Sequence, residues 1–87
     1  TIDRHALWKY YIGDTYNVKC MCCSKIDITP FTFIAGHVTA LCKGGSNGID
    51  NLRVVCSYCD KAMGITDMVV FMALNGYGPG RNWMGRV

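Results

Sequence analysis

Two pairs of cysteines, each with two residues between the partners, constrain the fold of this chain more than any other feature. The first pair is Cys20 and Cys23, and the second is Cys56 and Cys59. Thiolates at this spacing can bind one metal ion from a tight turn, and two such turns complete a tetrahedral Cys₄ zinc site. We therefore predict one structural zinc ion bound by these four residues.

The length of the chain makes such a metal useful. With 87 residues the chain is one domain, and an apolar core of that size is marginal by itself. Metal binding would supply part of the folding free energy. Six cysteines also allow three disulfides, which is the alternative interpretation. We prefer zinc because the paired turns suit a metal and no signal peptide is visible. Reduced thiols then predict an intracellular reducing compartment, the cytoplasm or nucleus of a host, or a virion.

Two cysteines are left outside this zinc site. Cys22 competes with Cys20 and Cys23 for the metal, but the spacing favours the outer pair. Cys42 is predicted to be a small buried residue.

The charge of the chain is modest. The net charge is +3, from nine basic residues against six aspartates and no glutamate. Residues 76–87 contain Arg81 and Arg86 and no acid, so this segment holds two of the three excess charges. This pattern permits nucleic-acid contact without requiring it. The longest purely apolar run, residues 68–74, is too short for a membrane span, so we expect no membrane partner.

The hydrophobic pattern and the turn residues predict a small α+β domain. We expect helices over residues 3–12, 57–63 and 67–74, and strands over 28–35 and 52–55. In the first helix, Ile2, Ala6, Leu7 and Tyr10 should lie near one face, and the aromatic cluster of Trp8, Tyr10 and Tyr11 should pack in the core. Thr66 should cap the last helix, which should pack Met68, Val69, Phe71 and Met72 on the hairpin. The order of cysteine turn, hairpin, cysteine turn and helix corresponds to a zinc-stabilised treble clef over residues 1–75. Residues 76–87 form a Gly-rich basic tail that needs a partner or a docking groove to become ordered.

Several short motifs carry a resemblance to a known family. They are Gly36-His37-Val38, Gly44-Gly45, the segment Ile-Asp-Asn-Leu-Arg at 49–53, and Cys-Ser-Tyr-Cys-Asp at 56–60. In this order and spacing, over residues 20–64, the chain resembles the HNH endonucleases. That resemblance implies a ββα-metal core of the kind that is often stabilised by a Cys₄ zinc. The extension over residues 63–68, followed by Phe71, is similar to zinc-finger HNH relatives of large DNA viruses and phages, which implies a viral or mobile-element protein.

The chemistry of phosphodiester cleavage selects the candidate site residues. Cleavage needs a base that activates water and a divalent cation that stabilises charge. His37 is the candidate general base, Asn51 is the candidate to hold its ring, and Asp60 is the candidate ligand of a catalytic Mg²⁺ or Mn²⁺. A purely structural His37 would instead brace the hairpin or replace a cysteine at the zinc.

One position departs from the family pattern. The residue before the base is usually acidic or a second histidine that binds the metal, and here it is Gly36. Because that ligand is missing, we expect a degenerate nuclease that binds DNA or RNA. The alternatives are an active metal-dependent endonuclease, and a non-enzymatic structural, virion or protein-interaction module whose tail contacts a partner. The candidates for phosphate contact are Lys43, Arg53, Arg81 and Arg86, each of which could equally be a solvated surface charge.

Overall fold

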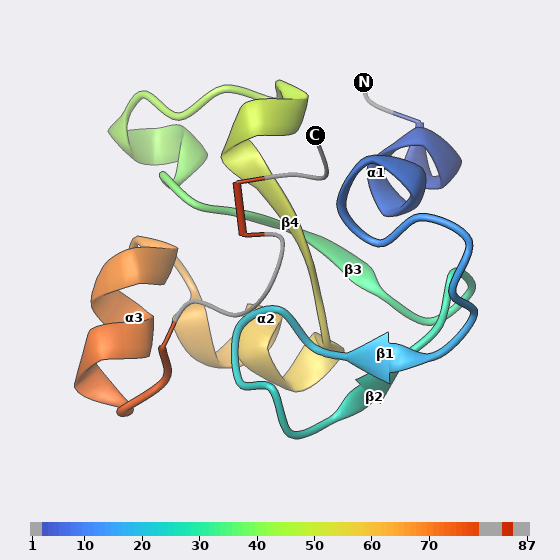
Figure 1. Ribbon diagram of the computed structural model, residues 1–87. Helices are drawn as coiled ribbons and strands as arrows, with labels where there is room; N and C mark the ends of the chain where they lie inside the picture. Colours follow the sequence, from blue (N-terminus) through green and yellow to red (C-terminus); the bar gives the residue numbers. More distant parts are fainter. Residues whose placement is uncertain (1–2, 79–82, 85–87) are drawn as a thin grey trace.

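Three α-helices and two short antiparallel hairpins make up the described part of the chain (Figure 1). The structure is a computed structural model that describes residues 3–78 and 83–84. The elements in chain order are α1 (Arg4–Tyr11), β1 (Val18–Lys19), β2 (Asp27–Ile28), β3 (Ile34–His37), η1 (Leu41–Lys43), η2 (Ile49–Asn51), β4 (Leu52–Val55), α2 (Ser57–Met63) and α3 (Met68–Leu74). The predicted α+β class is thereby confirmed.

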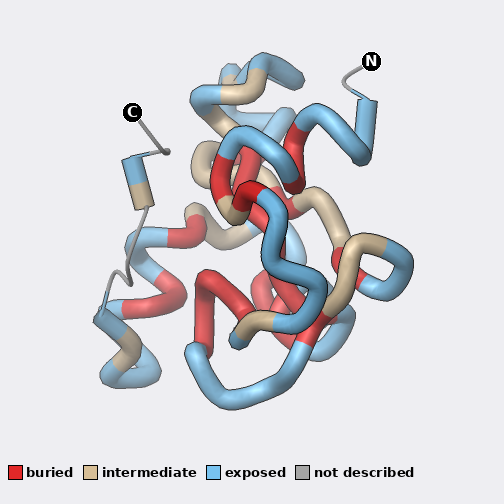
Figure 2. Tube along the Cα trace, turned by 45° about the vertical axis from the view of Figure 1, so that its right-hand side comes forward, coloured by how far each residue is buried: buried red, intermediate tan, exposed pale blue. Residues whose placement is uncertain are grey.

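The hairpin of β3 and β4 lies at the centre of the molecule. Its register pairs Ile34 with Val55 and His37 with Leu52. Helix α1 packs on β4 and α2 packs on β3, so all four residues of β4 are buried. Figure 2 shows the buried segments in the interior of the molecule, with exposed segments around them. The core therefore lies between α1, the hairpin and the two C-terminal helices.

Helix α1 begins and ends close to the prediction, and it buries two of the three aromatic residues expected in the core. Asp3 is its N-cap and accepts a hydrogen bond from the backbone N–H of His5. The buried residues are Leu7, Trp8 and Tyr11, whereas Ala6 and Tyr10 are exposed. Trp8 and Tyr11 are thus in the core as predicted, whereas the predicted core packing of Tyr10 and the placement of Ala6 on the apolar face are wrong. The helix turns the large Trp8 and Tyr11 rings inward, because these bury the most apolar surface.

The strand predicted over residues 28–35 is interrupted in the structure. Ile28 belongs to β2 and Ile34 to β3, with a turn between them. The Thr29 carbonyl accepts hydrogen bonds from the backbone N–H groups of Thr32 and Phe33. Pro30 explains the break, since proline lacks the N–H group that a strand ladder needs.

The last two helices follow the sequence closely. Strand β4 and helix α2 have the predicted bounds, and α3 begins one residue after its N-cap, Asp67, in place of the predicted cap Thr66. Met68, Phe71 and Met72 are buried as predicted, whereas Val69, which was expected to pack with them, is exposed. No helix within the described residues is long and apolar enough to cross a membrane.

Part of the predicted tail contacts the domain. Tyr77 and Trp83 are partly buried against the hydrophobic core. The basic residues predicted to reach phosphate from this segment, Arg81 and Arg86, lie outside the described residues.

Candidate metal centre and the adjacent groove

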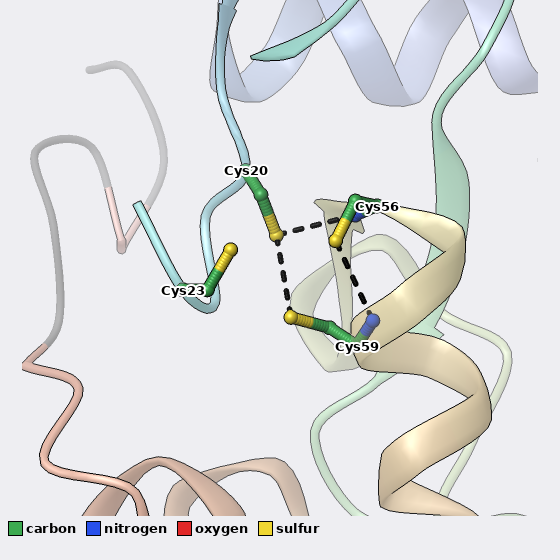
Figure 3. Close-up of side chains that lie close together, drawn as sticks. All are labelled: Cys20, Cys23, Cys56 and Cys59. Atoms are coloured by element: carbon green, nitrogen blue, oxygen red, sulfur yellow. Dashed lines mark hydrogen bonds between the residues drawn. The ribbon is translucent and has the colours of Figure 1, made fainter. Parts of the chain in front are cut away.

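The four cysteines of the two pairs converge on one point. The sulfur atoms of Cys20, Cys23, Cys56 and Cys59 all lie within 4.8 Å of one another, and all four residues are buried. Figure 3 shows their side chains pointing towards a common centre from the turn after β1 and from the start of α2. A tetrahedral zinc ion with Zn–S bonds of about 2.3 Å requires sulfur atoms about 3.8 Å apart. The Cys20 and Cys59 sulfurs are 3.9 Å apart, so the cluster fits a zinc ion.

Backbone N–H groups hold the sulfur atoms in place. The Cys20 Sγ accepts hydrogen bonds from the N–H groups of Cys22, at 3.3 Å, and Cys56, at 3.2 Å (Figure 3 draws the second). Cys56 is the N-cap of α2, and its Sγ accepts from the N–H of Cys59 at 3.4 Å. Such bonds stabilise the thiolate form that binds metal. Because Cys20 and Cys56 are linked directly, the cluster joins the N-terminal part of the chain to α2.

The surroundings of the thiols favour a bound cation. Burial raises the pKa of Cys20, and burial together with the negative charge of Cys20 raises the pKa of Cys59. Although burial acts against it, hydrogen bonds from the backbone N–H groups of Ile26 and Lys25 lower the pKa of Cys23. Four thiolates this close repel one another without a metal. A divalent cation offsets that repulsion and the cost of burying the charge.

The two remaining cysteines separate clearly in the structure. All six cysteines are free thiols, so the alternative of three disulfides is not observed. Cys22 is fully buried beside the cluster but is not one of its four residues, and burial raises its pKa to about 11. Cys42 is exposed, so its predicted burial is wrong. It lies on η1, a single turn at the surface that buries none of its residues.

A groove lined in part by α2 contains two of the predicted site residues. His37, at the end of β3, and Asp60, in the first turn of α2, both line a cavity of about 320 Å³. The rest of the lining comes from residues 40–42 and 63–66. His37 therefore lines this groove and is not part of the cysteine cluster, which excludes it as a ligand of a metal ion bound there. The structure brings the candidate base and the candidate metal ligand into one depression.

The ring of His37 is held by a residue that was not among the predicted site residues. Its Nε2 lies 2.8 Å from the Oδ1 of Asn47. The side chain of Asn51 instead bonds the loop, with its Oδ1 accepting from the Thr39 N–H and its Nδ2 donating to the Thr39 and Ser46 carbonyls. The prediction that Asn51 holds the ring is therefore wrong. The sequence showed only that this loop contains a second asparagine, Asn47, besides Asn51.

Arg53 is the other predicted contact that the structure places elsewhere. Its side chain is 5% exposed, and its Nη1 donates to the Tyr11 hydroxyl and to the carbonyls of Asp50 and Leu52. The guanidinium lies 4.7 Å from the ring centroids of both Tyr11 and Trp83. A guanidinium enclosed in this way is not available to a phosphate group, so the prediction for Arg53 is wrong. It packs between α1 and the C-terminal segment.

The lysines at the surface fit phosphate contact better. Lys43 is about half exposed, and its Nζ lies 3.9 Å from Asp67 beside the groove. Lys61 follows Asp60 on α2, is exposed, and makes no ion pair with a described residue. These two cations lie on the elements that form the walls of the groove.

The comparisons with known proteins find no significant match among protein-family models, curated proteins or solved structures.

Proposed function

We propose that this chain is an HNH-like treble-clef domain, stabilised by one zinc ion, that binds nucleic acid without cleaving it. The observation that carries the proposal is the unit of β3, β4 and α2. The cysteine cluster lies at the start of α2, and a groove with His37 and Asp60 lies along the same helix. This arrangement places one imidazole and one carboxylate in a mostly apolar depression of about 320 Å³, a size that suits a phosphodiester.

The polar residues in the groove and on the elements that form its walls have different roles. Lys43 and Lys61 are the cations that would contact phosphate, and such contacts provide affinity without sequence preference. His37 would donate or accept a hydrogen bond at the same backbone. Asp60 repels a bare phosphate, so a divalent cation or a nucleobase amino group is the partner that its carboxylate favours.

Gly36 supports the loss of cleavage. It is buried, and a Cβ atom at this position would lie 3.0 Å from the Cε of Met68 and 3.0 Å from the Cγ2 of Val55. A carboxylate or an imidazole here would have to displace the packing of α3 on the hairpin. Asp60 is thus the single described carboxylate lining the groove. One protein ligand is a weak site for a catalytic cation.

Fluorescence anisotropy with labelled duplex DNA, single-stranded DNA and RNA tests the binding. We expect the zinc-loaded protein to bind at least one of them, and His37→Ala to weaken that binding. His5→Ala is the matched control, because His5 is exposed on α1 and does not line this groove. Equal affinities for the wild type and His37→Ala would place the binding surface elsewhere.

Cleavage is tested separately with supercoiled plasmid and Mg²⁺ or Mn²⁺. We expect no nicking above the level of His37→Ala. Nicking that depends on both His37 and Asp60 would show that the domain is an active endonuclease.

A protein-interaction module is the second candidate, and a particular surface favours it. Ile65, Val69, Val70 and Leu74 are 50–79% exposed on and beside α3, a helix without a charged residue. Exposed apolar groups gathered in this way are typical of protein contacts. Two results together would favour this function. The chain would bind no nucleic acid, and it would bind a specific protein partner in a way that Leu74→Ser abolishes and His37→Ala does not.

A further inference from the structure

The hydrogen bond between Asn47 and His37 determines the state of the imidazole. The Oδ1 atom of an asparagine only accepts hydrogen bonds, so the His37 Nε2 that lies 2.8 Å away must donate. The neutral ring then carries its proton on Nε2 and keeps the free lone pair on Nδ1. The opposite tautomer would require the Asn47 amide nitrogen to face the ring.

The loop that carries Asn47 is braced from both sides. Asn51 bonds the Thr39 carbonyl at 3.0 Å and the Ser46 carbonyl at 2.8 Å, while Gly48 N–H donates to the Ser46 Oγ at 3.2 Å. Gly45 passes so close to this frame that a Cβ there would overlap the Thr39 carbonyl oxygen. These contacts therefore hold the residues on either side of Asn47 in place.

The other ring nitrogen is left for the groove. His37 lines the groove and Asn47 does not, so the Nε2 edge turns towards the loop. Within the described residues, Nδ1 has no hydrogen-bond partner. We infer that Asn47 is a positioning residue that holds His37 as the Nε2–H tautomer and directs Nδ1 at the ligand. This inference concerns the groove of the proposed function and rests on it for the identity of the ligand.

Nitrogen-15 NMR of the histidine rings tests the tautomer directly. The chain has two histidines, and the exposed His5 serves as the internal reference for an imidazole without a fixed partner. In the neutral wild type we expect a proton on Nε2 alone for His37, and both tautomers for His5. Asn47→Ala should shift the His37 tautomer ratio roughly fivefold towards the mixture seen for His5, which corresponds to one hydrogen bond of about 1 kcal/mol. Asn47→Asp keeps an acceptor oxygen and should restore the wild-type ratio.

Three outcomes decide the inference. A proton on Nδ1 in the wild type, or an unchanged ratio in Asn47→Ala with the zinc content intact, would overturn it. In anisotropy with the same labelled oligonucleotides, Asn47→Ala should lose most of the affinity that His37→Ala loses. If His37→Ala binds the oligonucleotide poorly but Asn47→Ala binds it with full affinity, the positioning role is also refuted. If the wild type binds no oligonucleotide, the proposed function fails, and the NMR result by itself decides the tautomer.

Discussion

Replacement of a single cluster cysteine should unfold this domain, whereas replacement of its neighbours should not. Cys59 is fully buried and its sulfur lies within 4.8 Å of three others. Structural zinc contributes about 10–16 kcal/mol of apparent binding free energy at neutral pH. A domain of 87 residues has a net stability of roughly 4–13 kcal/mol at 0.05–0.15 kcal/mol per residue. Because the zinc term is as large as the whole stability, Cys59→Ser should leave a largely unfolded chain.

Two other cysteines provide matched controls for this substitution. Cys42→Ser changes an exposed thiol, and it should keep one zinc per chain and the wild-type melting temperature. Cys22→Ser places a hydroxyl in a buried position, which costs roughly 1–3 kcal/mol, but it should also keep the zinc. The contrast between Cys22 and Cys59 separates metal ligation from simple burial, since both thiols are fully buried.

The assay combines metal analysis with thermal unfolding. The zinc content per chain is measured by atomic emission, and unfolding is followed by circular dichroism with and without a chelator. We expect the chelator to reproduce the effect of Cys59→Ser in the wild type. A chelated, metal-free wild type that still unfolds cooperatively would refute the reasoning, as would a purified protein that contains disulfides and no metal.

Three further perturbations have definite expected results. Gly45→Ala should destabilise the domain by about 1–3 kcal/mol in chemical denaturation, because the added Cβ would lie 1.9 Å from the Thr39 carbonyl oxygen. Gly78→Ala is the control and should have little effect, because a Cβ there has nothing within 4 Å. Trp83→Ala removes one of the two rings beside the Arg53 guanidinium and should cost roughly 0.5–2 kcal/mol, measured as a lower denaturation midpoint. In nucleic-acid binding, Lys61→Ala should reduce the slope of log K against log salt by about 1, and an unchanged slope would remove Lys61 from the interface.

The metal cluster and the elements beside it could be predicted from local sequence. The two cysteines of each pair are three residues apart, so one turn presents both of them, and the chain path elsewhere has little influence. Strand β4 and helix α2 follow directly from this, because Cys56 ends the strand and caps the helix. The predicted bounds of both were confirmed for this reason.

The errors at Asn51, Arg53 and Cys42 arose because the type of residue alone does not determine its contacts. Asn47 and Asn51 lie in the same loop, and only the folded path of the loop brings Asn47 to the ring of His37. Arg53 has the guanidinium group expected of a phosphate ligand. Tyr11 and Trp83, which are distant from it in sequence, enclose this group. Cys42 was predicted to be buried from the average behaviour of free cysteines, whereas the surface turn η1 exposes it.

The sequence by itself determined the four cysteines that could bind a metal ion and the class of fold. These depend on interactions between residues that are close along the chain, so spacing and pattern are sufficient to identify them. The tertiary structure decided which asparagine holds the imidazole, that Asp60 shares its groove, and that Arg53 is withdrawn from the surface. Each of these depends on contacts between segments separated by 10 to 42 residues, and their geometry is set only when the hairpin packs against α1 and α2.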